Sequence, residues 1–366
     1  MTTRTASALV LNRPRELERR QLPLPELDDH DGLLRVEACG LCGTDHEEYT
    51  GHLRAPYGFV PGHEAVGIVE AAGEAALQRW GVSVGDRVAV EVFMSCRSCG
   101  PFRAGVYRRC ERHGLADMYG FIDVGKGCGL WGGYASHLYL APDALVLPVP
   151  ESLDPVVATL FNPLGAGLRW GVEIPDLQPG AVVAVLGPGV RGLSVAAAVR
   201  GAGASFVMIT GLGARDEPRL AQAAAFGADL AVDVGVTDPV DALRQATGGL
   251  ADVVVDVTAK APTAPGQALR LVRAGGTVVL AGTRGSADAP GFDPDLVVYK
   301  EIHVVGALGV DADNYRAAID MLASDQYPFA ELPRQTAGFG DIESMVQTMA
   351  GETDRLPPVH AVFTPT

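Results

Sequence analysis

The sequence predicts an α/β protein in which a β-rich domain is joined to a doubly wound domain with a parallel sheet. Up to about residue 150, short apolar strands alternate with Gly and Pro turns. Further on, apolar strands are each followed by an Ala-rich helical stretch. A chain of 366 residues is also longer than a domain with a single hydrophobic core usually is. We therefore expect one domain over 1–155, completed by 308–366, and a second over 156–307.

The strands of both domains can be placed from apolar patterning. The chain end is also predicted as a strand, which could close back onto the first domain. The expected strands of the first domain are 33–37, 65–70, 86–90 and 359–363, and those of the second are 182–186, 206–210, 253–257, 277–281 and 303–307.

Composition excludes several classes of protein. The net charge of −15 argues against a nucleic-acid or anionic-membrane partner. No apolar stretch follows the initial Met-Thr-Thr-Arg and no run of 18 apolar residues occurs, so we expect neither a signal peptide nor a membrane span. Six cysteines do not make a disulfide scaffold in a chain of this length. We expect a cytoplasmic protein with free thiols.

Cys42 is followed 21 residues later by His63 and Glu64, with glycines beside both segments. Together these side chains supply a thiolate, an imidazole and a carboxylate. Three protein ligands leave a position for water or substrate, as in catalytic zinc sites, whereas structural sites are closed by four. The alternatives are an ordinary buried cysteine and a His–Glu surface pair.

The segment 187–192 reads Gly-Pro-Gly-Val-Arg-Gly and lies between an expected strand and an expected helix. In this context Gly-x-Gly-x-x-Gly predicts a dinucleotide site. Gly187 permits the tight turn, Gly189 lets a pyrophosphate approach, and Gly192 lets the helix pack closely on the sheet. Val190 and Arg191, at the helix start, belong to the same site. The alternative is a plain glycine-rich turn.

Cofactor choice depends on the end of the second strand of this domain, where a carboxylate would hold the ribose of NAD. Gly211 occupies that position, and no carboxylate occurs before Asp216. Arg215 or Arg219 could bind the 2′-phosphate of NADP. The sequence therefore favours NADP over NAD, unless Asp216 only caps a helix and the preference is set elsewhere. Thr258, after the third strand, is a further candidate contact of the cofactor.

Five motifs together resemble the zinc-containing alcohol and polyol dehydrogenase branch of the medium-chain dehydrogenase/reductase superfamily, over essentially the whole chain. They are Cys-Gly-x-Cys-Gly-Thr-Asp at 39–45, Pro-Gly-His-Glu-x-x-Gly at 61–67, Gly-Asp-Arg-Val at 85–88, Gly-Gly-Tyr-Ala at 132–135 and the glycine motif at 187–192.

The resemblance implies a GroES-like catalytic domain, a Rossmann domain, and hydride transfer between an alcohol or ketone and a nicotinamide. It implies that Cys42 and His63 ligate zinc, and that Glu64 ligates it or waits beside it. It further implies that the Thr44 hydroxyl passes on the substrate proton and that Asp45 lies behind the metal-bound His. Since a threonine alone is a poor base, this relay needs the cofactor ribose and water.

The sequence departs from the family pattern at the remaining zinc position, where relatives carry Cys, Asp or Glu. This chain offers Asn162, whose neutral amide is a weaker ligand. Glu64 thereby gains importance. The alternative is that zinc is absent and Asn162 only bonds to the backbone.

A second departure lies in the lobe that holds a structural zinc in the family. Cys96, Cys99 and Cys110 are present, but Phe102 stands where a further cysteine is expected. His113 could substitute after a rearrangement. We expect instead a lobe held by packing, without tightly bound zinc.

A third departure concerns the end of the proton relay, where many relatives have His five residues after the first zinc cysteine. Glu47 occupies this position, with His46 beside it. Either could exchange protons with solvent, or both could be surface residues. Candidates for the lining of the substrate pocket are Tyr57, Phe93, Met94, Trp131 and Phe161, although side chains of this kind are more often plain core.

These observations predict a zinc-assisted oxidoreductase acting on a small alcohol, preferentially secondary, or a ketone, with NADP or NAD. A homodimer or homotetramer is expected. Two alternatives stay open: a zinc-independent NADPH reductase of activated carbonyls or double bonds, and a non-catalytic nicotinamide-binding protein.

Overall fold

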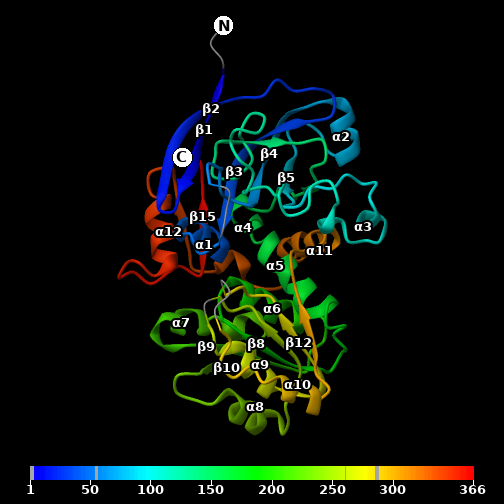
Figure 1. Ribbon diagram of the computed structural model, residues 1–366, viewed down its shortest axis with the longest axis vertical. Helices are drawn as coiled ribbons and strands as arrows, with labels where there is room; N and C mark the ends of the chain where they lie inside the picture. Colours follow the sequence, from blue (N-terminus) through cyan, green and yellow to red (C-terminus); the bar gives the residue numbers. More distant parts are fainter. Residues whose placement is uncertain (1–3, 54–56, 260, 285–287) are drawn as a thin grey trace. The chain divides into compact units, whose positions relative to one another are not determined.

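The computed structural model describes residues 4–53, 57–259, 261–284 and 288–366, which fold into two compact units (Figure 1). The first unit consists of Met1–Asn162, Asp311–Asp325 and Pro333–Thr366. The second consists of Pro163–Val310 and Gln326–Leu332. Each unit is built around its own sheet.

The sheet of the first unit has the strand order β14-β15-β3-β4-β5-β7, with β6 paired to β3. All neighbours are antiparallel except β14 and β15. A separate hairpin joins β1 and β2. These strands are β1 (Thr5–Arg13), β2 (Glu16–Pro23), β3 (Gly32–Leu41), β4 (Glu64–Ala72), β5 (Arg87–Val90), β6 (His137–Leu140), β7 (Val146–Pro148), β14 (Arg334–Ala337) and β15 (His360–Phe363).

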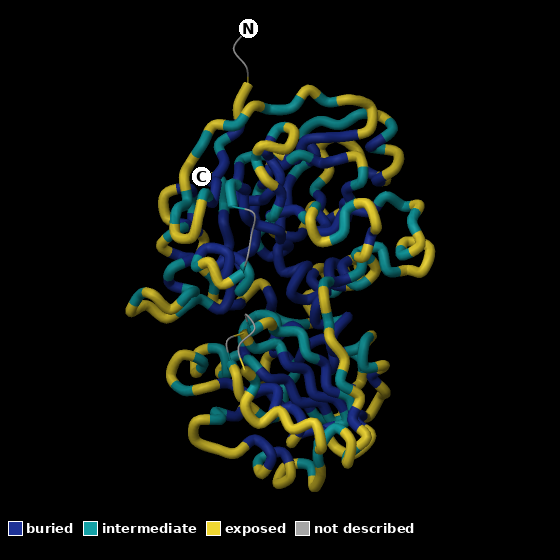
Figure 2. The backbone as a smooth tube through the Cα atoms, viewed as in Figure 1, coloured by how far each residue is buried: buried dark blue, intermediate teal, exposed yellow. Residues whose placement is uncertain are grey.

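Short helices complete the first unit. They are α1 (Gly43–Thr50), α2 (Glu74–Trp80), α3 (Gly100–Arg103), the 3₁₀ turn η1 (Tyr107–Arg109), α4 (Pro155–Ala158), α11 (Ala312–Ala323) and α12 (Ile342–Ala350). The strand β3 contributes to the core of this unit, because Leu34, Val36 and Ala38 are almost completely buried. Figure 2 shows buried chain at the centre of each unit and exposed chain mainly around it.

The second unit contains a six-stranded parallel sheet with the order β10-β9-β8-β11-β12-β13. Its strands are β8 (Val182–Leu186), β9 (Phe206–Gly211), β10 (Leu230–Asp233), β11 (Ala251–Asp256), β12 (Val272–Leu280) and β13 (His303–Gly306). The strand order reverses between β8 and β11. In an open sheet of this kind, ligands bind beyond the carboxyl ends of the strands at such a switch point.

The helices between these strands follow the expected βαβ alternation. They are α6 (Val190–Gly201), α7 (Gly213–Leu220), η3 (Ala223–Phe226), α8 (Pro239–Thr247), α9 (Ala264–Leu271) and α10 (Pro294–Tyr299). The helix α5 (Phe161–Leu168), which begins in the first unit, and the π-helical turn η2 (Arg169–Glu173) precede β8, and η4 (Phe329–Glu331) follows β13. In the described part of the chain, no helix has the length and apolar character that crossing a membrane requires.

The predicted strands lie within or next to observed ones. The strand at 182–186 coincides with β8, and the terminal strand β15 pairs antiparallel with β3, as expected. The hairpin β1–β2 and the strands β6, β7, β10 and β14 were not among the predicted strands. Because β2 is mostly polar and part-exposed, and β10 has only four residues, neither gives a strong apolar pattern.

Candidate active site and metal centre

Cys42 stands at the N-cap of helix α1, directly after strand β3. The backbone N–H of Thr44 donates to Cys42 Sγ at 3.3 Å. The side chain of Asp45 accepts from the Cys42 N–H at 2.8 Å, which completes a capping box. Asp45 therefore fixes the backbone that carries the thiol.

His63 and Glu64 directly follow Gly62, a position at which the backbone and its contacts favour glycine. Gly62 has φ +92°, and a Cβ there would lie 2.6 Å from Tyr134 and 2.9 Å from Cys39 Sγ. Gly40, opposite Glu64 in the β3–β4 pairing, leaves room for its carboxylate, since a Cβ would meet Glu64 Oε2 at 2.3 Å. The glycines of both motifs thus serve to seat the two side chains.

The structure brings Cys42, His63 and Glu64 together. Cys42 Sγ lies 3.3 Å from His63 Nε2, and His63 Nε2 lies 4.0 Å from Glu64 Oε1. One ligand atom from each lies within 4.8 Å of the other two, and all three side chains are buried. A buried sulfur, nitrogen and oxygen at this spacing are the donor set of a zinc site with an open position. The residues therefore fit the metal.

Asn162 is also buried, at the start of α5. Its amide nitrogen donates to the Tyr315 hydroxyl at 3.0 Å, and Tyr315 packs on the ring of Phe161. Because the amide nitrogen is bonded to Tyr315, the amide oxygen is the atom of this side chain that remains for a different partner. Tyr315, on α11, comes from a distant part of the sequence and could not be predicted as its partner.

Glu48 is a buried carboxyl that the sequence analysis missed. It is 0% exposed, and neither of its oxygens has a hydrogen-bond partner among the described residues. Burial, and next the charge of Asp45, raise the pKa of Glu48 well above its usual range. Glu48 follows Asp45 by three residues on α1, and this helical spacing was the available signal.

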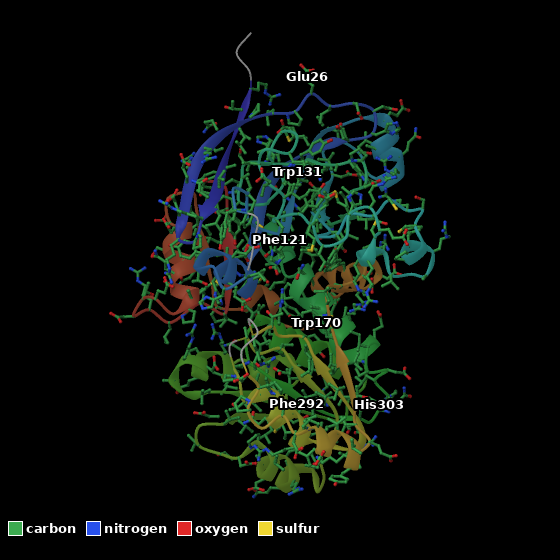
Figure 3. The ribbon with its side chains drawn as sticks, viewed as in Figure 1. Glu26, Phe121, Trp131, Trp170, Phe292 and His303 are labelled. Atoms are coloured by element: carbon green, nitrogen blue, oxygen red, sulfur yellow. The ribbon has the colours of Figure 1, made fainter. Side chains whose placement is uncertain are left out.

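His46 and Glu47 are both buried, at 8% exposure each, so the alternative of two surface residues is wrong. The ring of Phe121, which is labelled in Figure 3, lies 5.8 Å from the ring of His63. This contact was not predicted from the sequence. Among the predicted lining residues, Trp131 packs edge-on against Tyr139 at 5.1 Å and belongs to the core, together with buried Met94.

The three lobe cysteines also come together. The Sγ atoms of Cys96, Cys99 and Cys110 lie within 4.8 Å of one another. The Cys96 N–H donates to Cys110 Sγ at 3.4 Å, and the hydrogen bond from the Ser98 hydroxyl is the main cause that lowers the pKa of Cys96 to about 6. These thiols fit a metal, but Phe102 has no donor atom.

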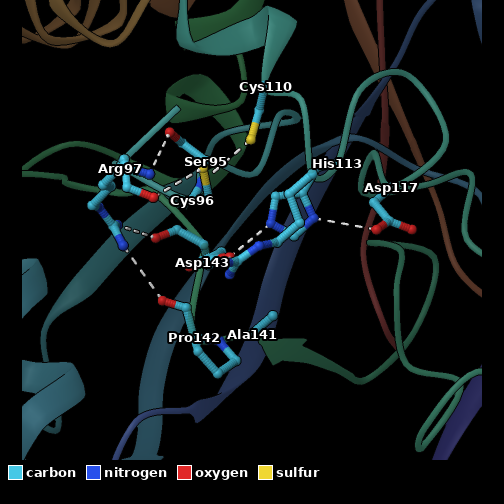
Figure 4. A network of polar contacts seen from close by, with 12 residues as sticks. Ser95, Cys96, Arg97, Cys110, His113, Asp117, Ala141, Pro142 and Asp143 are labelled. Carbon is cyan, nitrogen blue, oxygen red and sulfur yellow. Dashed lines mark hydrogen bonds and ion pairs between the residues drawn. The ribbon is translucent and has the colours of Figure 1, made fainter. Parts of the chain in front are cut away.

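His113 is not placed as a further ligand of this lobe. Its Nε2 lies 2.8 Å from Asp143 Oδ2, and its Nδ1 lies 3.2 Å from Asp117 Oδ2 (Figure 4). Arg112 and Lys126 pair with the same two carboxylates. Since both ring nitrogens have carboxylate partners, His113 ties the lobe to its surroundings.

In the second unit, the predicted dinucleotide turn connects β8 to α6. Gly187 has φ +101°, and a Cβ on Gly192 would meet the Gly187 carbonyl oxygen at 1.8 Å. Nothing lies within 4 Å of a Cβ on Gly189. Gly187 and Gly192 thus fit the turn and the close helix packing, while the space at Gly189 suits a pyrophosphate. The guanidinium of Arg191 lies 5.4 Å over the ring of Trp170.

Gly211, at the end of β9, is required by packing as well. A Cβ there would lie 2.8 Å from Pro188 and 3.0 Å from Asp216. Asp216 accepts from the Leu212 N–H at 2.9 Å and pairs with Arg219 at 3.0 Å. Arg219 is therefore held by a carboxylate, whereas Arg215 is exposed on α7.

Comparison with known proteins identifies the family. The model of the alcohol dehydrogenase GroES-like domain matches residues 28–151, and that of the zinc-binding dehydrogenases matches 191–324. A protein of Mycobacterium tuberculosis named "Probable alcohol dehydrogenase adh" is 66% identical over 98% of both chains. The chain belongs to the zinc-containing alcohol dehydrogenase family.

Other members agree with this assignment. The sorbitol dehydrogenase of Bacillus subtilis is 30% identical, with 87% of this chain and 86% of that one covered. The solved structure of a zinc-binding dehydrogenase from Sinorhizobium meliloti 1021, bound to NADP, has a TM-score of 0.83 at 26% identity, covering 99% and 100% of the two chains. This chain is thus an oxidoreductase that transfers a hydride between an alcohol or ketone and a nicotinamide cofactor.

Proposed function

We propose that this dehydrogenase acts with one zinc ion held by Cys42, His63 and Glu64, on a small and preferentially secondary alcohol or the matching ketone. The observation that carries the proposal is the buried sulfur–nitrogen–oxygen set within 4.8 Å. The relative named sorbitol dehydrogenase supports a polyol or secondary alcohol as the substrate class. The GroES-like domain, 1–155 with 308–366, is proposed to supply the metal and substrate residues, and 156–307 the cofactor site.

Within this site each residue has a physical task. When bound, the metal supplies Lewis-acid polarisation of the substrate oxygen. Thr44, the second residue of α1, offers the hydroxyl for the proton relay. The buried His46 and Glu47 would carry the proton onward from it. Asp45 holds the Cys42 backbone in place. Asn162 remains a weak candidate for the last ligand position.

A panel of alcohols and ketones, run with both nicotinamides and with or without a chelator, tests this function. We expect turnover of secondary alcohols that falls at least tenfold after chelation and returns with zinc. Chelator-resistant turnover of a zinc-free preparation would contradict the metal assignment. It would favour the zinc-independent reductase, for which the neutral Asn162 is the motivating observation.

For the cofactor we propose NADP over NAD. Gly211 provides no carboxylate to repel a 2′-phosphate, and a side chain at that position would collide with Pro188. Arg215 is an exposed cation on α7, the helix that follows this strand end. The variant Arg215→Ala should therefore weaken NADPH several-fold and leave NADH unchanged, as measured by fluorescence titration. Equal losses for both cofactors would contradict this choice.

We propose that the cysteine lobe does not depend on zinc for its structure. Asp143 pairs with His113 and Arg112, and Asp117 pairs with Lys126. We propose that these pairs, and no metal, keep the lobe in place. Phe102→Cys should raise the zinc content by up to about one ion per chain, since it adds a fourth thiol. The wild-type lobe binding zinc as tightly as this variant would contradict the proposal.

We further propose a homo-oligomer that is formed through strand β13 and works in the cytoplasm. The strand β13 ends the sheet of the second unit, and the nearby Val298, Tyr299 and Leu308 are 70%, 81% and 57% exposed. An apolar edge at the end of a sheet is suited to pairing with a second copy.

The cytoplasm is proposed as the compartment because of the cysteines. The free thiols at Cys96 and Cys99 suit a reducing compartment.

A further inference from the structure

Asp256 and Arg284 meet beyond the carboxyl ends of two adjacent strands of the second unit. Asp256 is the last residue of β11, and Arg284 follows β12 by four residues. The two side chains form an ion pair in which Asp256 is 0% and Arg284 is 11% exposed. No motif identified in the sequence contains either residue. A charge pair this deeply buried is costly to form, so it calls for an explanation.

The pair ties together two loops. Arg284 Nη2 donates to Asp256 Oδ2 and, at 3.0 Å, to the Thr258 hydroxyl. Arg284 Nε donates to the carbonyl of Ala261 at 3.1 Å, and Nη1 donates to that of Gly282 at 2.9 Å. All three guanidinium nitrogens are therefore used to hold the chain after β11 against the chain after β12.

Thr258 is the residue that this arrangement holds most firmly. Its hydroxyl donates to Asp256 Oδ1 at 2.6 Å and its N–H donates to the same oxygen at 3.0 Å. Its Cγ2 lies 3.1 Å from the position of a Cβ on Gly187, and its carbonyl oxygen would lie 1.8 Å from one on Gly282. Thr258 is thus clamped between the dinucleotide turn and the β12 loop.

The place in the sheet indicates what the clamp faces. A doubly wound sheet binds a dinucleotide across its switch point, one nucleotide over each half. The phosphate turn and Gly211 belong to the half made of β8, β9 and β10. The half made of β11, β12 and β13, where the clamp lies, is left to receive the nicotinamide nucleotide.

Charge gives the clamp a second consequence. The nicotinamide ring carries a positive charge when oxidised and none when reduced, so nearby protein charges bind the two forms differently. Burial raises the pKa of Asp256, and bonds from Thr258 and the charge of Arg284 oppose this rise. The pair as a whole is close to neutral, and its neutrality depends on both partners.

We propose that Asp256 and Arg284 are positioning residues that clamp Thr258 under the nicotinamide half of the cofactor, and that their mutual neutralisation keeps the site open to the oxidised form. This inference rests on the binding of a nicotinamide cofactor by the second unit. It adds two residues to that site which contribute through Thr258 and through charge.

The first test separates the two halves of the cofactor. ADP-ribose, or its 2′-phosphate, carries every part of the cofactor except the nicotinamide. By calorimetry, Arg284→Met should weaken the reduced dinucleotide about tenfold, because the loop contacts are lost, and should leave ADP-ribose within about twofold. Equal weakening of both ligands would show a general structural role and overturn the clamp.

The second test concerns charge. Asp256→Asn leaves the Arg284 charge unbalanced, so the ratio of the dissociation constants of oxidised and reduced cofactor should rise about tenfold. The double variant D256N/R284M removes both charges and should bring the ratio back to that of the wild type. An unchanged ratio in D256N, or a raised ratio that persists in the double variant, would contradict the charge argument.

A matched control lies at the opposite end of the same two strands. Asp252 on β11 pairs with Arg273 on β12 at 2.6 Å. Asp252→Asn should leave the ratio of dissociation constants unchanged, and an equal shift would overturn the proposal. If D256N does not fold, Arg284→Lys provides a second variant, which keeps the positive charge but loses the several hydrogen bonds of the guanidinium. The oxidised and the reduced dinucleotide should then bind more weakly by the same factor. A changed ratio of their dissociation constants would contradict the charge argument. Wild-type protein that binds neither dinucleotide nor ADP-ribose would instead contradict the cofactor site itself.

Discussion

At the scale of single residues, the proposed metal site depends on Gly62 as much as on its three side chains. Gly62 combines a left-handed backbone, φ +92°, with contacts that leave no room for a Cβ. Any other residue would strain the backbone and push against Tyr134 and Cys39. The next residue is His63, so that strain would be passed directly to a proposed metal ligand.

The variant Gly62→Ala should therefore lose stability and zinc together. Gly85→Ala is the matched control, since Gly85 has φ +97° but nothing within 4 Å of its Cβ. We expect Gly62→Ala to cost about 2 kcal/mol more than Gly85→Ala in urea unfolding, because of the added collisions. Equal costs, with zinc retained in both, would show that packing around Gly62 is not decisive.

Local motifs predicted the residues that lie close together in sequence or belong to a recurring pattern. Cys42, His63 and Glu64 meet as expected, and the glycine turn lies between β8 and α6. Glu48, Tyr315 and the Asp256–Arg284 pair were not predicted. Their roles arise from burial and from contacts between distant segments, which no short pattern records.

At the scale of elements, Glu91 joins the end of β5 to the cysteine lobe. The Tyr107 hydroxyl, in η1, donates to Glu91 Oε2 at 2.7 Å, and the Phe93 N–H donates to Oε1 at 3.1 Å. Glu91 is 0% exposed, and burial raises its pKa to about 8 despite these bonds. Burial thus favours the protonated carboxyl, whereas the two hydrogen bonds favour the ionised one, and burial dominates.

This raised pKa predicts how stability changes with pH. Between the usual pKa of a glutamate and about 8, the folded state binds more protons at Glu91 than the unfolded state, so its contribution to stability falls as the pH rises. The loss is at most about 1.4 kcal/mol per pH unit. Glu91→Gln should remove this slope. Relative to the wild type, its free energy of unfolding should therefore increase from pH 5.5 to pH 7.5.

Urea unfolding of both proteins at the two pH values provides the measurement. Glu343→Gln is a suitable control, because Glu343 also accepts a tyrosine hydroxyl, that of Tyr49 at 2.9 Å, but is only part-buried. A pH-independent difference between wild type and Glu91→Gln would show that the buried carboxyl does not carry the linkage.

At the scale of the whole molecule, we expect two copies of the chain to associate through the edge of the second unit's sheet. Val305, on β13, is 36% exposed on the strand that ends this sheet among the described residues. A lysine there would place a charge in the interface, which is how natural proteins protect such edges. Light scattering should show that Val305→Lys lowers the molecular mass from an oligomer toward 38.2 kDa.

Val236→Lys is the control for this prediction, since Val236 is 84% exposed in the same unit but not on β13. It should leave the mass unchanged. A wild-type protein that is monomeric at micromolar concentration would contradict the proposed oligomer.

The central claim is that Cys42, His63 and Glu64 hold the zinc without an ionised residue at position 162. Zinc content per chain is its most direct measurement, made in a Cys110→Ser background so that the lobe contributes no metal. We expect about one zinc per chain with Glu64 present. Glu64→Ala should lose the metal and the turnover, while Asn162→Ala should keep the zinc content within about twofold. Retention of zinc in Glu64→Ala together with its loss in Asn162→Ala would contradict the account.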